Sequence, residues 1–425
     1  MRTIICDTET SGLDPHFDQI IEICMIVKSN DQIVDELHLY LSMDVHRRPP
    51  SPQAIKSNKT PINSLTEGMN SREAMIEVSE FISKHSPALF ICHNAVFDFK
   101  FIFNALFQTL ATDDWYSLKS SGNRLLCSLH LSKAAYVFNK HSKINFIDEY
   151  GVPRFDLESL CSANSIEHPQ AHSALADVHA LDKYIELLKK DSPELFNMSF
   201  EFSSKQNTIN FLNSNVFSLT DYGFAENIHS VPFVPMAVDE KKLALLAIDL
   251  ARYDERIHNF TIKKLVRQLS GDRNINLPVI KIPINRSKLF FDLNHFSSLE
   301  TDLTQTQMFK VASGLRRNRN LRSIFSRSLE VSLDLFQNDE SVEHQIYEGF
   351  CSPREKRFIH EFNSAPASEK INVITAFKHR MASSRLIRLA NRIVASQYPQ
   401  NLDHSTLETF HTWALDRILE NESFQ

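Results

Sequence analysis

Two acidic residues, Asp7 and Glu9, lie one residue apart in the N-terminal sequence IICDTETSGLDP. If the chain is extended here, side chains at alternate positions point to the same face, so the two carboxylates lie together. Adjacent carboxylates raise each other's pKa unless a cation lies between them. Oxygen ligands of this kind favour Mg²⁺ or Mn²⁺. By itself the pair is a common surface pattern, and it indicates a metal site only when further ligands accompany it.

Two later fragments supply such ligands. NAVFD (94–98) follows the apolar run ALFIC and places Asp98 at the start of an expected helix, where it would also serve as an N-cap. HSALAD (172–177) contains a histidine and an aspartate five residues apart, and five helical residues correspond to about 140° of rotation. We therefore expect His172 in the turn before a helix and Asp177 in the helix body, both reaching one site.

These three fragments together resemble the motifs of the DEDDh 3′→5′ exonucleases, whose fold is RNase H-like. Each of the five motif positions is filled in this chain: Asp7, Glu9, Asp98, His172 and Asp177. The resemblance implies two Mg²⁺ ions, or Mn²⁺, bound by the four carboxylates. It also implies that His172 is the general base for the attacking water, a role that suits an imidazole with a pKa of about 6.5.

The same resemblance gives candidate substrate contacts near the motifs. Glu9 is one, and Leu13 occupies the place of an apolar residue that packs against the terminal bases in this superfamily. A turn leucine buried in the core fits the position of Leu13 equally well. Asn94 and Phe97 are further candidates, although a core position is the favoured interpretation of Phe97 and Phe101.

The likeness extends to bacterial exonuclease I, a family that degrades single-stranded DNA. Residues 151–196 resemble the corresponding part of that family, and QIYEGFCSPREKR and SSRLIRLANRIVASQYPQNL resemble its C-terminal domain. The resemblance implies an α/β RNase H-like exonuclease domain at 1–197, a small SH3-like β-rich domain at 198–298 and an all-helical domain at 299–425. The implied activity is Mg²⁺-dependent release of 5′-mononucleotides from the 3′ end of single-stranded DNA, in DNA repair or recombination.

Local patterns predict several elements directly. Apolar residues are spaced as in strands at 2–7, 20–28 and 33–41. Helical spacing is found at 71–85, 124–138 and 156–164. Residues 198–230 have a weaker, polar pattern that is typical of a linker or of irregular strands.

Basic residues are concentrated in two stretches, although the net charge is −6. Lys and Arg outnumber Asp and Glu by 15 to 6 over 251–327 and by 9 to 3 over 351–400. Ordinary solvated faces would also explain these stretches. Three arginines are spaced to share one helix face, where they would contact DNA phosphates: Arg385, Arg388 and Arg392. A second cluster consists of Arg316, Arg317, Arg319, Arg322 and Arg327. The family resemblance implies that one cluster could bind the acidic tail of single-stranded DNA-binding protein instead, and the sequence leaves open which one.

Nothing in the sequence predicts membrane contact, because no stretch approaches the ~20 apolar residues of a membrane helix. The six cysteines form no CxxC pair and several lie in apolar runs, which predicts buried free thiols. We expect a monomeric, cytoplasmic protein. Two alternatives to the DNA exonuclease remain open: a DEDDh exonuclease that acts mainly on RNA or oligonucleotides, and a non-catalytic nucleic-acid-binding module, which would usually have lost a metal ligand.

Overall fold

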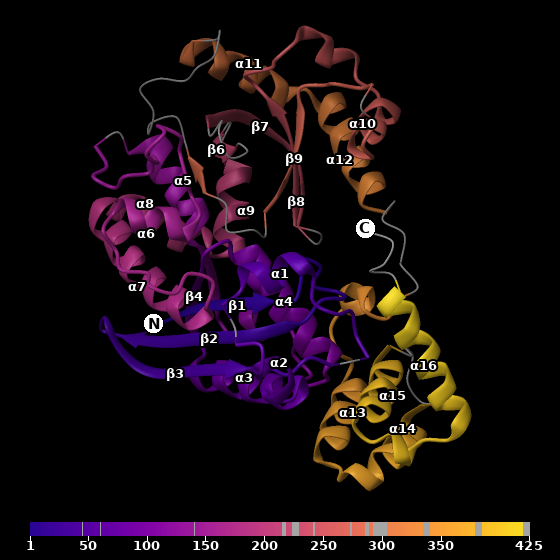
Figure 1. Ribbon diagram of the computed structural model, residues 1–425. Helices are drawn as coiled ribbons and strands as arrows, with labels where there is room; N and C mark the ends of the chain where they lie inside the picture. The colour runs from indigo at the N-terminus through magenta and orange to yellow at the C-terminus, as the bar shows by residue number, and fades with distance from the viewer. Residues whose placement is uncertain are drawn as a thin grey trace. The chain divides into compact units, whose positions relative to one another are not determined.

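The computed structural model describes most of the chain as two compact units (Figure 1). The first unit comprises residues 1–125, 167–182 and 338–425, and the second comprises residues 126–166 and 183–337. The residues that the structure describes are 1–44, 46–59, 61–139, 141–214, 218–222, 229–240, 243–272, 274–284, 289–291, 304–334, 341–378 and 385–419.

A mixed five-stranded sheet of order β3-β2-β1-β4-β5 organises the N-terminal part of the chain. Its strands are β1 (Arg2–Thr10), β2 (Ile20–Ser29), β3 (Gln32–Tyr40), β4 (Ala88–Cys92) and β5 (Arg124–Cys127). β1 pairs antiparallel with β2 and parallel with β4, so it lies at the centre of the sheet. The three predicted N-terminal strands are confirmed, and β1 continues past Asp7 and Glu9.

The helix predicted at 124–138 is wrong in its first four residues. These residues form β5, the strand next to β4, and helix α5 (Ser128–Phe138) begins after it. Leu125, Leu126 and Cys127 are buried in succession, and so short an apolar run has no periodicity that distinguishes a strand from a helix. The other predicted helices are confirmed as α3 (Ser71–His85) and α6 (Leu157–Ala163).

The N-terminal part contains further helices. They are α1 (Pro52–Ser57), α2 (Ser64–Glu67), α4 (Ala95–Gln108) and α7 (Ala174–Asp191). The helix α4 contributes Phe99, Ile102 and Leu106 to the buried core, which explains its continuous apolar sequence. All six cysteines are free and buried, as predicted.

Four helices near the C-terminus belong to the first unit: α13 (Pro353–Ser364), α14 (Lys370–Lys378), α15 (Arg385–Gln397) and α16 (His404–Leu419). Asn363 on α13 joins them to the N-terminal part of that unit. Its Oδ1 accepts a hydrogen bond from Arg72 Nη2 at 2.6 Å, and its Nδ2 donates to the carbonyl oxygen of Leu110 at 3.0 Å. A capping box formed by Ser352 and Glu355 starts α13.

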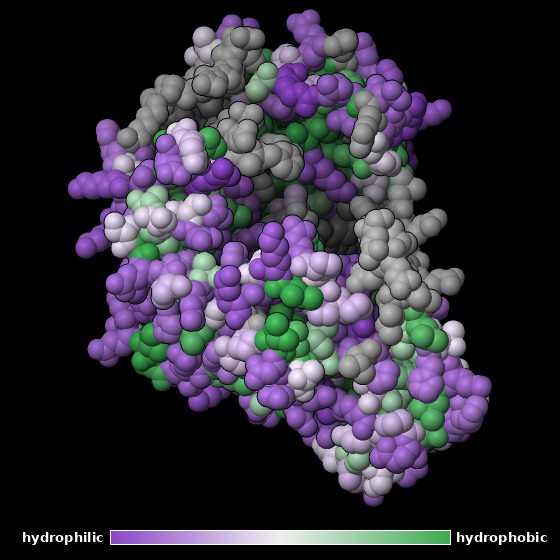
Figure 2. Space-filling model, in the orientation of Figure 1, coloured by the Kyte–Doolittle hydropathy of each residue, from purple (hydrophilic) through white to green (hydrophobic). Residues whose placement is uncertain are grey.

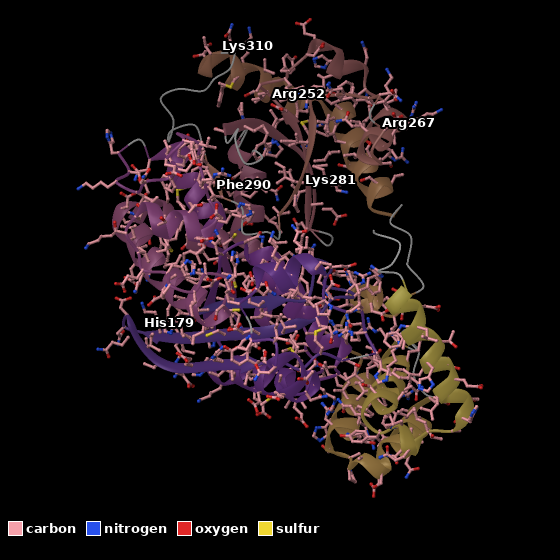
Figure 3. The ribbon with its side chains drawn as sticks, viewed as in Figure 1. His179, Arg252, Arg267, Lys281, Phe290 and Lys310 are labelled. Atoms are coloured by element: carbon pink, nitrogen blue, oxygen red, sulfur yellow. The ribbon has the colours of Figure 1, made fainter. Side chains whose placement is uncertain are left out.

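The second unit contains an antiparallel sheet of order β10-β6-β7-β8-β9. Its strands are β6 (Ser218–Tyr222), β7 (His229–Asp239), β8 (Ala244–Asp249), β9 (Val279–Pro283) and β10 (Phe290–Phe291). The fully buried Phe290 contacts the ring of Phe233 on β7 (Figure 3). Several basic side chains of this unit are exposed, among them Arg252, Arg267 and Lys310 (Figure 3).

Helices flank this second sheet: α8 (Pro193–Phe202), α9 (Lys205–Ser214), α10 (Ile262–Leu269), α11 (Gln305–Arg317) and α12 (Arg319–Asp334). The linker predicted to begin at residue 198 is therefore wrong for 198–214, because Ile209 and Leu212 of α9 pack against the sheet in spite of their polar neighbours. Met308 of α11 and Phe325 of α12 share a core with Leu246 of β8. The boundaries of the three predicted domains remain a prediction.

The surface shows no broad apolar belt on the face seen in Figure 2, where hydrophilic side chains surround small hydrophobic areas. Among the residues that the structure describes, no helix has the length and apolar character needed to cross a membrane.

Candidate active site

Asp7 and Glu9 on β1 lie in the central strand of the first sheet. A carboxylate oxygen of Glu9, a ring nitrogen of His172 and a carboxylate oxygen of Asp177 all lie within 4.8 Å of one another. Residues from β1 and from the start of α7 thus meet across 163 positions of sequence, as the motif spacing predicted. A cluster of this size and composition is able to hold a divalent cation.

Asp98 reaches the same region from the first turn of α4. Its Oδ1 accepts hydrogen bonds from the main-chain nitrogen of Thr8 at 3.1 Å and from Thr8 Oγ1 at 2.9 Å. Because Thr8 lies between Asp7 and Glu9, these bonds tie Asp98 directly to the strand that carries the first two acids. The predicted N-cap role of Asp98 is wrong: Asn94 occupies the N-cap position, with a left-handed φ of 59°, and α4 begins at Ala95.

His172 and Asp177 occupy the predicted positions in the turn and the helix. His172 lies before α7 with φ = 69°, a conformation that few non-glycine residues adopt, and its side chain is exposed. Its main-chain nitrogen lies 3.3 Å from Asp177 Oδ1, and its carbonyl oxygen accepts a hydrogen bond of 2.8 Å from the nitrogen of Lys59. The main chain of the turn is therefore held by contacts of both the nitrogen and the carbonyl oxygen of His172.

A second histidine, His168, lies against the site and was missed by the sequence reasoning. Its Nε2 is 2.5 Å from Asp177 Oδ1, and its side chain is almost completely buried. The signal in the sequence was a histidine four residues before His172, but nothing in that spacing indicated which of the two would contact Asp177.

Glu22 was missed as well. It is fully buried on β2, directly opposite Glu9 in the antiparallel pairing of β1 and β2. One carboxylate oxygen accepts hydrogen bonds from His38 Nε2 at 3.0 Å and from Ser173 Oγ at 3.1 Å, and it lies 3.5 Å from the main-chain nitrogen of Leu175. Glu22 therefore connects the sheet to the start of α7.

The carboxyl groups of Asp7, Glu9 and Asp98 lie close together in a buried part of the protein, and this raises their pKa values. Burial, together with the neighbouring Asp98, Asp177 and Glu9, raises the pKa of Asp7 well above its usual range. Burial, Asp177 and Glu22 raise the pKa of Glu9 to about 8, and burial raises that of Asp98 to about 7. Bringing these carboxylates together is unfavourable unless they are protonated or share a cation, so the donor set fits a divalent ion.

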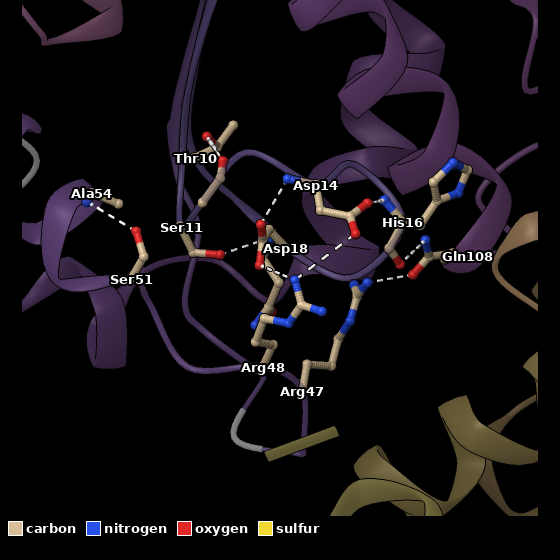
Figure 4. A network of polar contacts seen from close by, with 12 residues as sticks. Thr10, Ser11, Asp14, His16, Asp18, Arg47, Arg48, Ser51, Ala54 and Gln108 are labelled. Carbon is tan, nitrogen blue, oxygen red and sulfur yellow. Dashed lines mark hydrogen bonds and ion pairs between the residues drawn. The ribbon is translucent and has the colours of Figure 1, made fainter. Parts of the chain in front are cut away.

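The loop that follows β1 is held by its own polar contacts (Figure 4). Asp18 Oδ2 accepts a hydrogen bond from the nitrogen of Asp14 at 2.8 Å, and Asp18 Oδ1 pairs with Arg48 Nη1 at 3.4 Å. Ser11 exchanges two hydrogen bonds of 2.8 Å with the main chain of Gln19. These contacts fix the loop on both sides of Leu13.

The residues predicted to contact substrate differ in their exposure to solvent. Leu13 is 82% exposed, so the alternative that it is buried in the core is wrong. Asn94 is exposed, whereas Phe97 is half-buried with its ring centroid 4.8 Å from that of Phe101. Phe101 is a core residue, as expected. The substrate roles of Leu13, Asn94 and Phe97 remain predictions.

The predicted stripe of solvent-facing arginines on α15 is wrong. Arg385 is 2% exposed and donates hydrogen bonds to the carbonyl oxygens of Gln345 at 2.8 Å and Gly349 at 3.1 Å. Arg392 pairs with the buried Glu343 at 2.5 Å, and Arg388 is half-buried. Arg385 and Arg392 of α15 therefore contact neighbouring segments of the same chain. Amphipathic spacing shows which residues share a helix face, but it does not show what covers that face. In the second cluster, four residues are exposed on α11 and α12: Arg317, Arg319, Arg322 and Arg327.

Comparisons with known proteins agree with this geometry. Residues 4–184, which contain all five motif residues, match the family model described as Exonuclease. The exodeoxyribonuclease I of Haemophilus influenzae is 24% identical over 452 residues, covering 99% of this chain and 94% of the relative. The chain is therefore similar to bacterial exonuclease I over most of its length.

Solved structures give the same result for the fold. The crystal structure of E. coli exonuclease I in complex with a dT13 oligonucleotide has a TM-score of 0.83 at 19% identity, over 98% of this chain and 91% of that one. A crystal structure of SSB/exonuclease I in complex with the inhibitor CFAM has a TM-score of 0.79 at 20% identity, over 97% and 90%. The predicted fold class is thereby confirmed, with a mixed α/β exonuclease domain and substantial helical content.

Proposed function

We propose that the protein is a metal-dependent 3′→5′ exonuclease that degrades single-stranded DNA to 5′-mononucleotides. The observation that carries this proposal is the convergence of Glu9, His172 and Asp177 within 4.8 Å, next to Asp98 and Asp7, in a chain similar to exonuclease I. The complete set of acids argues against a non-catalytic binding module.

The four carboxylates would hold two divalent cations, for which we propose Mg²⁺, with Mn²⁺ as a substitute. Such ions stabilise the attacking and leaving oxygens of a phosphodiester during hydrolysis. The chain's own acids would position the scissile phosphate, with Asp98 fixed by Thr8 and Asp177 fixed by His168. The exposed imidazole of His172 would accept the proton of the attacking water, since its turn holds it beside Glu9 and Asp177.

The proposal is tested by degradation of labelled nucleic acid with the full-length protein. We expect hydrolysis of single-stranded DNA with Mg²⁺, little hydrolysis of blunt duplex, and none with excess EDTA. Asp7→Ala should abolish the reaction, because it removes one of the acids of the site. Preferential hydrolysis of RNA would favour the alternative of an RNA or oligonucleotide exonuclease, and full activity of the Asp7→Ala protein would contradict the proposed site.

We further propose that single-stranded DNA-binding protein is a partner, and that the exposed arginines of α11 and α12 receive its acidic tail. The complex described for SSB and exonuclease I supports the pairing. An acidic peptide should bind the parent protein and lose affinity in Arg317→Ala/Arg322→Ala. Unchanged peptide affinity in that double variant would place the contact elsewhere.

A further inference from the structure

A pocket of about 400 Å³ lies in the first unit of the structure, outside the candidate active site. Residues of α3, α15 and α16 line it, together with Gln108 at the end of α4. None of the five motif residues is among the described residues that form its lining. Cavities of this size are typical of sites for small molecules. Six lining residues define what we call the α16 pocket: Arg72, Leu389, Arg392, Ile393, Phe410 and Trp413.

Arg72 brings a buried positive charge to the α16 pocket. It lies in the first turn of α3 and is 9% exposed, and its Nη2 donates the hydrogen bond of 2.6 Å to Asn363. Within the described part of the chain, its Nε has no hydrogen-bond partner and its guanidinium forms no ion pair with a carboxylate. Burial lowers the pKa of Arg72, and the nearby Tyr398 and Glu73 offset this effect only in part. Buried charges in proteins are normally paired, so this guanidinium calls for an anionic ligand.

Trp413 on α16 supplies a second donor without an acceptor. The guanidinium of Arg392 lies over its ring, 4.0 Å from the centroid, and this contact joins the indole to α15. The indole Nε1 is buried and has no hydrogen-bond partner among the residues that the structure describes. Buried N–H groups nearly always have an acceptor, so one that lacks it within the protein points to a bound molecule. An anion with several oxygens provides acceptors for both Trp413 and Arg72.

The acids that line the pocket do not neutralise the buried arginine of α3. Glu343 pairs with Arg392 at 2.5 Å, and Asp44 pairs with His46 at 3.2 Å. Glu73 is exposed, so water and salt screen its charge. The positive charge in the buried part of the pocket is therefore available to a ligand.

The start of α3 adds to this preference for an anion. Asn70 is the N-cap of this helix of 15 residues, and Asn70 and Ser71 line the pocket together with Arg72. The N-terminus of a helix carries a partial positive charge and main-chain N–H groups that suit a phosphoryl group. A buried guanidinium, an indole N–H group and a helix N-terminus thus meet in one pocket.

An apolar part of the lining comes from α15 and α16. Leu389, Ile393 and Phe410 are buried, and the ring centroid of Phe410 lies 5.6 Å from that of Trp413. Aromatic and aliphatic side chains of this kind bind a flat ring such as a nucleobase. A ligand that combines a planar ring with a phosphoryl group matches both parts of the lining.

We propose that the α16 pocket binds a nucleoside 5′-monophosphate, with the phosphoryl group beside Arg72 and Trp413 Nε1 and the base against the apolar side chains of α15 and α16. The choice of this nucleotide rests on the proposed function, because mononucleotides are the products of the proposed reaction. The pocket itself is independent of that function. Gln108 is the last residue of α4, and Asp98 lies in the first turn of the same helix, which separates the two sites by about 15 Å along its axis.

The test is isothermal titration of the full-length protein with thymidine 5′-monophosphate (dTMP) in EDTA, which keeps divalent ions out of the catalytic site. We expect Trp413→Phe to raise the Kd about 10-fold or more, because it keeps an aromatic ring and removes a hydrogen bond to a charged group. Arg72→Gln should raise the Kd by at least the same factor. Asp7→Ala changes only the catalytic site and should retain the parental Kd. A matched control is Arg357→Gln, which replaces an arginine of α13 whose side chain is 75% exposed.

Tryptophan fluorescence locates the bound nucleotide. The chain has two tryptophans, and the other one, Trp115, is 1% exposed in the core. Binding of dTMP should change the emission of the parent protein, and this change should be absent in Trp413→Phe. Inorganic phosphate and thymidine test the two halves of the ligand separately. Each should bind about 10-fold or more weakly than dTMP, because one lacks the base and the other lacks the phosphoryl group.

The outcomes separate this inference from the proposed function. A parent protein that degrades no single-stranded DNA refutes the nuclease proposal, whereas the titration in EDTA still decides the fate of the pocket. Absence of dTMP binding, parental Kd in Trp413→Phe, or loss of binding in Asp7→Ala overturns the pocket as a nucleotide site. Equal affinities for phosphate and dTMP also overturn it, because the apolar side chains would then contact no base. If Arg72→Gln fails to fold, Trp413→Phe still gives the result.

Discussion

Ser173 Oγ donates a hydrogen bond of 3.1 Å to the carboxylate of Glu22, which is completely buried. Glu22 lies on β2 opposite Glu9, and Ser173 directly follows His172 in the turn that precedes α7. One buried acid thus links the strand beside a proposed metal ligand to the turn that carries the proposed general base. Such outer contacts orient the groups that bind metal and substrate.

Replacing Glu22 should therefore weaken metal binding without removing a ligand. We expect Glu22→Ala to raise the Mg²⁺ concentration for half-maximal activity by about 10- to 100-fold, the usual effect of losing an orienting partner. Mg²⁺ titration of the hydrolysis rate measures this. Glu22→Gln keeps an acceptor oxygen for Ser173, so it should raise this Mg²⁺ concentration by a smaller factor. A matched control is Glu36→Gln on β3, where the carboxylate is partly exposed and lies 3.8 Å from His179.

His168 should orient the Asp177 carboxylate for metal binding, so replacing His168 should also weaken metal binding. We expect His168→Ala to reduce metal affinity by about 10-fold or more, because the Asp177 carboxylate loses the ring that fixes one of its oxygens at 2.5 Å. His168→Asn retains a donor and should recover part of the loss. Isothermal titration with Mn²⁺ checks the affinity directly, and parental affinity in His168→Ala would show that Asp177 needs no such partner.

The pKa shifts predict how metal-free stability depends on pH. The folded protein holds the Glu9 proton more tightly than the unfolded chain does, since the pKa of Glu9 rises from 4.5 to about 8. The stability from this group is fully present below about pH 4.5 and is lost as pH rises towards 8. Mg²⁺ binds the deprotonated carboxylates, so its stabilising effect should grow over the same interval.

Melting temperatures in EDTA and in Mg²⁺, measured from about pH 5 to about pH 8, test this dependence. We expect the two curves to diverge as the pH rises. Glu9→Gln does not titrate and should flatten the EDTA curve. A constant difference between the two conditions at every pH would contradict the shifted pKa.

The positions of Asp7, Glu9, His172 and Asp177 on their elements were predictable from local rules, whereas Asp98 was joined to them only by the resemblance to the DEDDh exonucleases. Strand alternation puts Asp7 and Glu9 on one face, and helical rotation separates His172 from Asp177. The strands of the first sheet followed from their apolar patterns, whereas β5 did not, because four residues show no period.

The missed features all depend on contacts between distant segments. Glu22 and Ser173 are 151 positions apart, and Arg72 and Asn363 are 291 positions apart. Spacing showed that the arginines of α15 share a face, but only the fold shows that Gln345 and Gly349 cover Arg385. Sequence pattern thus predicts which residues share a surface, and packing decides what that surface meets.

Arg385 is expected to stabilise the folded protein. Its guanidinium is buried, binds two carbonyl oxygens, and lies 3.9 Å from Glu355. Arg385→Ala should lower the free energy of unfolding by about 3 kcal/mol, since it leaves these buried groups without their cation. The exposed Arg317→Ala should change it by no more than about 0.5 kcal/mol. Chemical denaturation of both variants measures the difference, and equal stabilities would mean that Arg385 is not a structural residue.

Gly12 is expected to be essential for the loop that presents Leu13. A Cβ atom at this position would lie 2.3 Å from Asp18 Oδ2, and Asp18 cannot move aside because Asp14 and Arg48 hold its carboxylate. Gly12→Ala should therefore displace the loop and lower kcat/KM on single-stranded DNA by up to about 100-fold, since small misplacements near reacting groups have effects of this size.

The matched control for this substitution is Gly314→Ala in the interior of α11. No atom lies within 4 Å of the Cβ that it would add, and removing a helical glycine should stabilise the protein by about 0.5–1 kcal/mol. We expect kcat/KM to stay at the parental value in this control and to fall only in Gly12→Ala. Parental kcat/KM in Gly12→Ala would show that the loop tolerates displacement, and that Leu13 is not positioned by the close approach of Gly12 and Asp18.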